Sequence, residues 1–275
     1  MALESGACGS VMQVAALVGY DGTAYCGYQV QPGVPTIQGA LEESLATFTS
    51  MQGRIAGAGR TDTGVHARGQ VIGLTLPWRH ELAALQRAWN AHLPPDIVIR
   101  QVAAAPDGFH PRFRAERRTY RYFVRQGALR EPLSSRYRLD VLQSLDLEAM
   151  QAAAQQLLGT HDFATFGNPP QGESTVRTVF AAEWHVERPD AMALQDERRL
   201  VFTMTANAFL QHMVRKVVGS LLEVGRGRWS VSRFSSALQA ANGALSAPPA
   251  PPSGLFFEWV TYPEPYQLFA EPVAG

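Results

Sequence analysis

The spacing of apolar positions divides the first hundred residues into six elements. Residues 13–20 form a nearly continuous apolar run, which is typical of a buried strand. Thr36 precedes apolar residues at helical spacing and is expected to cap a helix. The elements that follow are strands near 54–58 and 69–76, a helix that ends before Pro94-Pro95, and a strand at 97–103. The predicted order is strand, helix, strand, strand, helix, strand.

A similar order recurs from Thr119 onward. A strand is expected at 119–125, and Asp146 is expected to cap a helix that Gly159 ends. The further elements are strands near 176–186 and 199–206, a helix capped by Asn207, a short helix that starts at Ser230, and a strand from Leu255 to Tyr262. The repetition lies in element order, because no residue-level repeat is visible.

This order predicts an α+β protein built from two tandem ferredoxin-like βαββαβ halves with antiparallel sheets. The first half is expected to span residues 13–108 and the second residues 109–263, with tails at 1–12 and 264–275. Residues 104–116 are expected to link the halves, and the Pro248–Pro252 cluster to form a loop before the last strand.

Composition narrows the class of protein. The chain has 275 residues, of which 46% are hydrophobic and 17% charged, so it can bury a core without a disulfide or a metal. Two cysteines and seven scattered histidines give no metal-ligand spacing, and we expect no metal. The N-terminus has no leader-like pattern and no segment is apolar enough to span a bilayer, which predicts a cytoplasmic protein without membrane contact.

Charge is balanced overall but unevenly distributed. Lys+Arg and Asp+Glu are both 24, which by itself indicates neither a nucleic-acid partner nor an acidic one. Lys216 is the only lysine, and nine arginines lie between Arg112 and Arg138. A GC-rich coding bias explains the excess of arginine over lysine, but not this clustering.

A glycine-flanked loop between two predicted strands carries the first candidate chemistry. It reads Gly-Arg-Thr-Asp-Thr-Gly over residues 59–64, and its glycines permit a tight reversal close to a ligand. In a structural role, Asp62 would accept backbone hydrogen bonds in an Asx turn. With an arginine two residues away and no second carboxylate nearby, a lone ionised Asp62 also suits a nucleophile or an electrostatic stabiliser.

The second candidate is a segment from Phe109 to Tyr122 in which arginines alternate with aromatic residues. In a strand, Tyr120 and Tyr122 would point to one face, and Thr119 and Arg121 to the other. Guanidinium groups bind phosphates and aromatic rings stack on unpaired bases, so RNA suits such a segment. A solvated edge strand with a half-buried tyrosine face explains the same pattern.

Five blocks together resemble the tRNA pseudouridine synthase A family from about residue 13 to 263. They are Tyr20–Gln29 (YDGTAYCGYQ), the loop pattern Gly-Arg-Thr-Asp-x-Gly-Val-His-Ala, the Arg/aromatic segment, Asn207–Ser220 (NAFLQHMVRKVVGS) and Gly254-Leu255. The loop pattern is highly specific to that family, and the blocks occur in the family's order.

The resemblance implies an isomerase that converts uridine to pseudouridine at positions 38, 39 and 40 of the tRNA anticodon stem-loop, without a cofactor. It also implies a homodimer whose monomers have two similar halves around a central basic cleft, the pseudouridine synthase fold. The family's catalytic aspartate falls on Asp62, its substrate-contacting tyrosine on Tyr120, and its base-extruding arginine on Arg60. Arg215 corresponds to the ion-pair partner of the aspartate, and Leu255 to an apolar wall.

The arginines of the Arg/aromatic segment are expected to contact phosphates and so set the register of the RNA without reading its sequence. They are Arg112, Arg114, Arg117, Arg118 and Arg121. Arg60 has a second interpretation as an ion-pair partner of Asp62. We expect the remaining histidines of the motifs, His66, His110 and His161, to be structural.

The chain departs from the usual family pattern at several positions. Thr63 stands where alanine is usual, Tyr28 where tryptophan is common and Pro111 where alanine is common. Residues 167–170 read Gly-Asn-Pro-Pro without an early basic residue, which removes a phosphate contact.

The residues leave several points open. Asp62 can attack C1′ or abstract a C2′ proton, and the tRNAs modified are not specified. A non-catalytic tRNA-binding protein or chaperone, and a pseudouridine synthase acting on another RNA, are the alternatives.

Overall fold

The computed structural model describes residues 11–169, 174–188 and 197–271. Its strands are β1 (Met12–Tyr20), β2 (Gln52–Gly57), β3 (His66–Leu76), β4 (Ile97–Ala104), β5 (Arg117–Gln126), β6 (Leu139–Val141), β7 (Gly159–Asp162), β8 (Val176–Val186), β9 (Arg198–Ala206) and β10 (Leu255–Thr261). Its α-helices are α1 (Ile37–Ala46), α2 (Leu82–His92), α3 (Leu147–Gln155), α4 (Met213–Gly225) and α5 (Val231–Gln239), with short 3-10 turns at Gly243–Leu245 and Pro252–Gly254.

These strands form one mixed sheet in the order β4-β1-β3-β10-β5-β9-β8-β7, with β2 beside β3 and β6 beside β5. The strands of the first half run in the order β4-β1-β3-β2, and those of the second half in the order β10-β5-β9-β8. Position by position, the two orders are the same. The element order βαββαβ predicted for residues 13–103 is confirmed.

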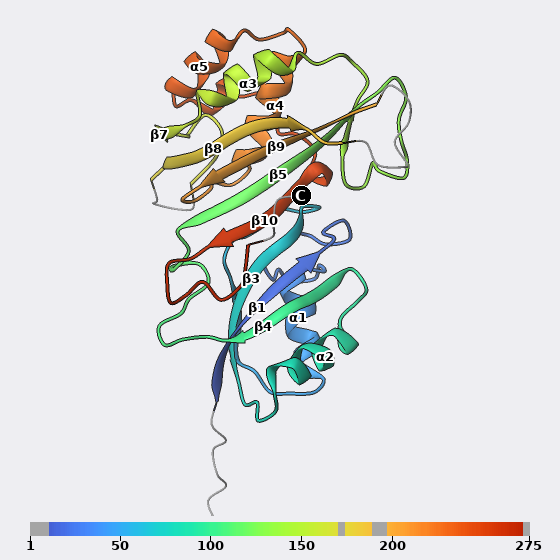
Figure 1. Cartoon of the computed structure of the whole chain (residues 1–275), viewed down its shortest axis with the longest axis vertical. Helices are drawn as coiled ribbons and strands as arrows, with labels where there is room; N and C mark the ends of the chain where they lie inside the picture. Colours follow the sequence, from blue (N-terminus) through green and yellow to red (C-terminus); the bar gives the residue numbers. More distant parts are fainter. Residues whose placement is uncertain (1–10, 170–173, 189–196, 272–275) are drawn as a thin grey trace, which may run out of the picture.

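The two halves meet where β10 lies between β3 and β5 (Figure 1). β10 pairs antiparallel with β5 but parallel with β3, at Phe256–His66 and Phe257–Ala67. The expectation of antiparallel sheets is therefore wrong in part: the sheet is mixed, with β10 parallel to β3 at this junction and β6 parallel to β5. β10 therefore joins the second half to β3, the strand that follows the Asp62 loop.

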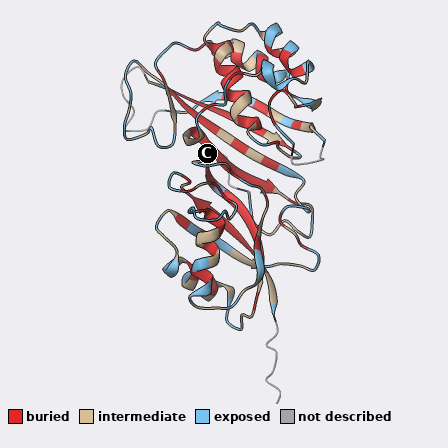
Figure 2. Ribbon diagram, turned by 180° about the vertical axis from the view of Figure 1, so that it is seen from behind, coloured by how far each residue is buried: buried red, intermediate tan, exposed pale blue. Residues whose placement is uncertain are grey.

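Helices cover the sheet in two groups: α1 and α2 with the first half, and α3, α4 and α5 with the second (Figure 1). Buried residues concentrate in the central strands and on the inner sides of these helices (Figure 2). Tyr122 on β5 and Phe257 on β10 are fully buried. The core is therefore continuous across the junction. No helix in the described part of the chain is long and apolar enough to cross a membrane.

Two predicted helix caps, at Thr36 and Asp146, and the predicted start of a helix at Ser230 are confirmed. The side chains of Thr36, Asp146 and Ser230 each accept a hydrogen bond from the backbone N–H three residues later, at the start of α1, α3 and α5.

The prediction that Asn207 caps a helix is wrong. Asn207 Oδ1 accepts instead from the backbone N–H groups of Thr178 and Ala208, so it closes a turn at the end of β9. The helix α4 begins six residues later, with His212 as its N-cap residue. A short polar side chain after a strand suits a turn as well as a cap, and the tertiary contact with Thr178 decides between them.

Candidate functional site

The loop that carries Asp62 is fixed at its start by Gln70 on β3. Gln70 Nε2 donates to Gly59 O at 2.8 Å, and Gly59 N donates back to Gln70 Oε1 at 3.3 Å. A Cβ on Gly59 would lie 2.8 Å from the ring of Phe257. Glycine is therefore needed here because β10 packs directly against the loop, which brings the second half of the protein to the site.

The tyrosine-rich segment after β1 holds the middle of the loop. Tyr20 Oη and Thr61 Oγ1 are hydrogen-bonded at 2.8 Å, and the backbone N–H of Tyr28 donates to Thr61 O at 3.0 Å. Gly27 has a φ of 89°, and a Cβ there would lie 2.8 Å from Thr61 O. The close backbone approach at Gly27 explains why a glycine interrupts this tyrosine run.

Asp62 is paired with Arg215 of α4, which lies 153 residues further along the chain. Arg215 Nη1 donates to Asp62 Oδ2 at 3.2 Å, and the side chains are 15% and 25% exposed. Asp62 does not have the contacts of the Asx turn considered for it, because the described contacts of its carboxylate are with the side chains of Arg215 and His212. The other interpretation of Arg60, as its ion-pair partner, is not supported either: Arg60 is exposed and forms no described ion pair.

Arg215 is itself held from the loop before β10. Its Nε donates to Ala250 O at 2.8 Å, and Ala250 N donates to Arg215 O at 2.9 Å. A Cβ on Gly219, one turn later in α4, would lie 2.2 Å from Pro248 O. The close packing of α4 on residues 248–250 therefore fixes the direction from which the guanidinium approaches Asp62.

His212 also faces Asp62, and the sequence analysis did not single it out. Its Nε2 lies 3.7 Å from Asp62 Oδ2, and its side chain is 35% exposed. The residue has a φ of 63°, in the left-handed region that favours glycine. The signal available in the sequence is its place three residues before Arg215. Strained backbone of this kind is frequent at functional sites.

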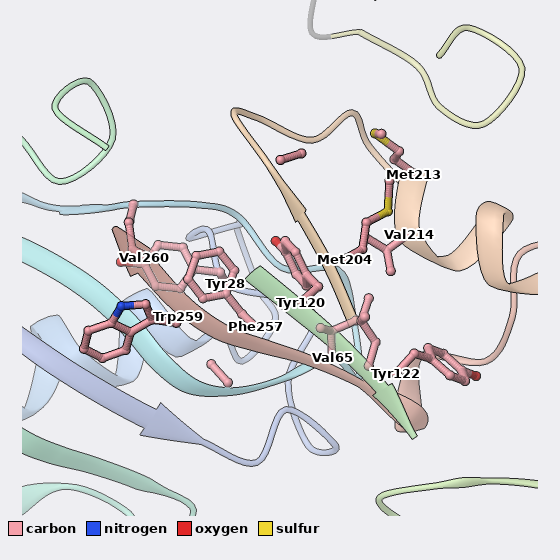
Figure 3. Packing of buried hydrophobic residues seen from close by; sticks show 14 of the residues in the cluster. Tyr28, Val65, Tyr120, Tyr122, Met204, Met213, Val214, Phe257, Trp259 and Val260 are labelled. Atoms are coloured by element: carbon pink, nitrogen blue, oxygen red, sulfur yellow. The ribbon is translucent and has the colours of Figure 1, made fainter. Parts of the chain in front are cut away.

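Tyr120 of β5 lies beside Asp62 in a pocket of aromatic rings. Its ring makes edge contacts with Phe209 and Phe257, with ring centroids 4.8 Å and 4.9 Å away, and only 7% of the residue is exposed. Figure 3 shows Tyr120 beside Phe257. Burial raises the pKa of the Tyr120 phenol well above its usual value, and the nearby Tyr20 and Asp62 add to that effect. Tyr120 is therefore a neutral phenol at physiological pH.

Leu255 opens β10 and is 5% exposed. The preceding Gly254 admits no side chain, since a Cβ would lie 2.8 Å from Phe123 O and from the ring of Tyr122. Tyr122 Oη in turn donates to Pro251 O at 2.8 Å. The Gly254-Leu255 pair thus lies directly against β5 and the aromatic residues around Tyr120.

A contact between the halves covers the other end of the loop. Tyr137, between β5 and β6, donates from Oη to Asp21 Oδ2 at 2.9 Å, and its ring lies against His66. Burial lowers the pKa of His66, although the nearby Asp21 carboxylate works against that effect. His66 Nδ1 lies 3.2 Å from Gly22 N and 3.1 Å from Asp21 Oδ1, so its described contacts hold β3 against the segment after β1, which fits the structural assignment of His66.

A cavity of about 790 Å³ lies between these segments. Its walls come from Thr63 and Gly64 of the Asp62 loop, from residues 132–137 and from Pro252 and Ser253. The cavity therefore borders the loop that carries Asp62. Among the described residues, no three His, Cys, Asp or Glu side chains gather as a metal site would require.

The arginines of the Arg/aromatic segment do not share one environment. Arg112, Arg114 and Arg117 are exposed, so phosphates can reach them. Arg121 lies on the opposite face of β5 from Tyr120, 3.6 Å from Glu258. Arg118 is buried, and all its described hydrogen bonds go to backbone carbonyl groups. The expected phosphate contact does not fit Arg118 in this structure, because the linker and the Asp62 loop enclose its guanidinium.

The segment that departs from the usual family pattern lies next to the start of α4. Asn168 and Gln211 form an isolated bridge, in which Gln211 N donates to Asn168 O at 3.2 Å. A Cβ on Gly167 would lie 2.4 Å from the Leu210 side chain. Residues 167–169 therefore support the segment that carries His212, while Pro170 lies outside the described residues.

Comparison with protein families bears directly on this site. A family model described as tRNA pseudouridine synthase matches residues 16–114 and 153–263, which is more than half of the chain. The chain belongs to the tRNA pseudouridine synthase family. The two matched segments of this family include the Asp62 loop, Arg215 and Leu255, whereas Tyr120 falls between them.

Individual members of the tRNA pseudouridine synthase family match along most of their length. The tRNA pseudouridine synthase A of Chloroflexus aurantiacus (strain ATCC 29366 / DSM 635 / J-10-fl) is 43% identical over 260 residues, which cover 94% of this chain and 92% of that protein. The tRNA pseudouridine synthase A of Bordetella petrii (strain ATCC BAA-461 / DSM 12804 / CCUG 43448) is 40% identical over 252 residues, covering 90% and 91%. The resemblance expected from the sequence motifs is confirmed.

One solved structure gives a weaker match. The chain aligns with a chain of the crystal structure of the archaeal box H/ACA sRNP Nop10-Cbf5 complex at 9% identity and a TM-score of 0.32, over 76% of this chain and 44% of that one. A score this low carries no argument about the fold, so the family assignment depends on the sequence matches.

Proposed function

We propose that this protein isomerises uridine to pseudouridine in tRNA, with Asp62 as the catalytic carboxylate and without a cofactor. The observation that carries the proposal is the Asp62–Arg215 ion pair, which joins the two halves of the chain beside Tyr120. The relatives are named as tRNA pseudouridine synthase A, which supports tRNA as the substrate. The target positions 38, 39 and 40 of the anticodon stem-loop follow from the family resemblance.

The reaction breaks the bond between N1 and C1′, turns the uracil and joins C5 to C1′. In one route, a carboxylate oxygen of Asp62 forms an ester with C1′ while the electron pair of the broken bond stays on the uracil. In the other route, Asp62 takes a proton from C2′ as the bond between C1′ and N1 breaks, which gives a glycal and a uracil anion. The proton returns from Asp62 to C2′ when C5 joins C1′. Both routes end with the loss of the C5 proton and the gain of a proton at N1, and both require an ionised Asp62.

The geometry of the ion pair suits this role. The described contacts from Arg215 and His212 both reach Oδ2 of Asp62. Among the described residues, no hydrogen bond or ion pair reaches Oδ1, and a quarter of the Asp62 side chain is exposed. One oxygen is thus held by the cation, while the other is free to approach the sugar. A charge-assisted hydrogen bond of this kind is stronger than a neutral one, so it fixes the orientation of the carboxylate.

Tyr120 serves as the surface on which the uracil turns. Its neutral phenol is a poor base for the C5 proton, because burial raises its pKa above the usual range. A ring held between Phe209 and Phe257 is well fixed for stacking, which is worth on the order of 1–3 kcal/mol per base. Leu255 supplies an apolar wall next to it.

A uridine in a stem must leave the base stack before it reaches Asp62. Extrusion costs a few kcal/mol, and an inserted side chain can fill the vacated space. Arg60 is exposed, two residues from Asp62, and lacks a described ion-pair partner, so we assign it this role. The exposed Arg112, Arg114 and Arg117 are the candidate phosphate contacts that set the register of the RNA.

The fold has a corresponding interpretation. We infer two ferredoxin-like halves, residues 13–108 and 109–263, around a central cleft that contains Asp62. The repeated strand order of the two halves supports this division. Homodimerisation and a cytoplasmic location are carried over from the family resemblance and the sequence.

Conversion of tRNA uridines tests the proposal. The protein is incubated with unmodified tRNA, and pseudouridine is read as adduct-dependent stops in primer extension. We expect stops at one or more of positions 38, 39 and 40, and their loss in Asp62→Asn, which keeps the size of the side chain. The matched control Asp162→Asn removes an exposed carboxylate on β7 and should convert tRNA normally.

Full activity of the Asp62→Asn variant would reject Asp62 as the catalytic group. Binding of tRNA by both proteins without conversion by the unmutated one would favour a non-catalytic tRNA-binding protein. Ribosomal RNA is the second substrate in the same assay, and conversion confined to it would show a pseudouridine synthase acting on another RNA.

A further inference from the structure

Arg118 donates from every N–H of its guanidinium to a backbone carbonyl group. Its Nε and Nη2 each lie 3.2 Å from Ala58 O, and Nη2 also lies 2.6 Å from Arg112 O. Its Nη1 lies 2.7 Å from Asn207 O and 3.3 Å from Ala115 O. These five contacts use all five donors of the side chain.

This arginine is charged and buried, yet forms no ion pair with a carboxylate among the described residues. The residue is 9% exposed, and burial is the main cause that lowers its pKa. A buried charge is stable only when hydrogen bonds replace its hydration. Here four backbone carbonyl groups accept these hydrogen bonds. The charge of Arg118 is therefore compensated only while the segments that carry the four carbonyl groups stay together.

The four carbonyl groups belong to three segments that meet at the site. Ala58 begins the loop that carries Asp62. Asn207 follows β9 and begins the segment that leads to His212 and Arg215. Arg112 and Ala115 lie in the linker between the halves. Arg118 itself is two residues before Tyr120 on β5. One side chain therefore joins the backbone on both sides of the Asp62–Arg215 ion pair.

We propose that Arg118 is a positioning residue, which holds the Asp62 loop and the segment before α4 at the separation that the ion pair needs. The inference rests on the proposed function, since it assigns a role in that reaction. Arg118 contacts neither the substrate nor Asp62, and acts through Ala58 and Asn207. A displacement of about 1 Å in a catalytic group can lower a rate on the order of 100-fold.

A lysine cannot replace this arginine. Its ammonium group is a single point with three donors, whereas the guanidinium extends its donors in a fixed plane. In Arg118→Lys the charge remains, but the ammonium cannot reach Ala58 O, Arg112 O and Asn207 O together. The variant therefore separates the geometry of the contact from its charge.

The test measures single-turnover pseudouridine formation at saturating tRNA, together with the Kd for tRNA. For Arg118→Lys we expect a rate on the order of 100-fold lower, with a Kd within about threefold of the unmutated protein. In Arg118→Ala, methylguanidinium added at tens of millimolar should restore part of the rate, because it can occupy the space left by the side chain.

The matched control is Arg125→Lys. Arg125 is a second buried arginine of β5, but its partners are Glu197, Asp140 and Leu129 O, away from Asp62. The variant Arg125→Lys should lower the melting temperature as Arg118→Lys does, but its single-turnover rate should stay within about threefold of that of the unmutated protein. Rates are measured below the melting temperature of each variant.

Amide hydrogen exchange gives a readout that does not depend on activity. Exchange of the peptide that spans residues 58–65 should become faster in Arg118→Lys and stay unchanged in Arg125→Lys. Unchanged exchange in Arg118→Lys would overturn the proposal even if tRNA proved not to be the substrate. An unmutated protein without activity would instead reject the proposed function.

Two kinetic outcomes would also overturn the positioning role. A weaker Kd with a normal single-turnover rate in Arg118→Lys would make Arg118 an RNA contact. A lower melting temperature with a normal rate would make it a purely structural residue.

Discussion

The substitution Arg215→Gln tests the electrostatic centre of the site. In the structure, Nη1 of Arg215 lies 3.2 Å from Asp62 Oδ2, while its Nε lies 2.8 Å from Ala250 O. A glutamine amide can reach Ala250 O but not Asp62. The substitution therefore removes the cation and its hydrogen bond to Asp62, and retains the contact that fixes α4 to the loop before β10.

The size of the effect follows from this geometry. Hydrogen bonds to charged groups are worth about 1.5–3 kcal/mol. The side chains are 15% and 25% exposed, so solvent screens the pair only in part. Because about 1.4 kcal/mol corresponds to a factor of ten in rate, we expect the single-turnover rate to fall roughly 10- to 150-fold. Loss of the charge should affect the chemical step and leave the Kd for tRNA nearly unchanged.

The assay is single-turnover conversion of tRNA uridines at saturating enzyme, with pseudouridine read by adduct-dependent primer-extension stops. The control, at the opposite end of the same helix, is Arg226→Gln. Arg226 is the C-cap residue of α4, and its Nη1 lies 2.9 Å from Glu223 Oε1, so its loss removes an ion pair of similar length away from Asp62. This control should convert tRNA at the normal rate. Melting curves of both variants confirm that they are folded.

A rate for Arg215→Gln within threefold of the unmutated protein would refute the reasoning. It would show that Asp62 acts in the reaction without the guanidinium. An equal loss in Arg226→Gln would also count against it, because the effect would then come from α4 as a whole.

Three further predictions concern stability and binding. His212→Gly should be about 1 kcal/mol more stable to unfolding than His212→Ala, because glycine adopts the observed φ of 63° without strain; equal melting temperatures would contradict this. Burial acts to raise the pKa of Glu197, but hydrogen bonds from Arg125 and Arg199 hold it below its usual value of 4.5. The stability that this carboxylate contributes is therefore present above that pH and lost as the pH falls below it. Thermal melts of Glu197→Gln between about pH 6 and pH 3 should therefore depend less on pH than those of the unmutated protein, and parallel curves would reject this contribution. Finally, log Kd for tRNA should rise steeply with log salt concentration, and Arg112→Gln should reduce the slope by about one unit; a flat profile for the unmutated protein would exclude phosphate contacts by the exposed arginines.

Local sequence determined much of the secondary structure. The caps at Thr36 and Asp146 and the helix start at Ser230 were predictable, because a short polar side chain at a helix start makes its hydrogen bond within three residues. The strands on either side of the Asp62 loop followed from their apolar runs. Local rules failed at Asn207, whose side chain bonds to Thr178 on a neighbouring strand.

The sequence predicted some residues of the site correctly and missed or misplaced others. The motif around Asp62 identified the family, and the resemblance assigned Arg215 as the partner of the carboxylate, as the structure has it. His212 was missed because its closeness to Asp62 depends on where α4 begins. Arg118 was grouped with exposed arginines, since in the sequence it shares their spacing and charge.

The sequence by itself determined the family, the order of the elements and the loop that carries Asp62, because these depend on residues close together in the chain. The tertiary structure decided that β10 runs parallel to β3, that Arg118 is enclosed by four carbonyl groups, and that one oxygen of Asp62 has no described partner. Each of these depends on segments 60 to 190 residues apart in sequence, such as Arg118 and Ala58, Asp62 and Arg215, or Phe256 and His66. Their contact energies depend on distances that only the packed sheet and helices fix.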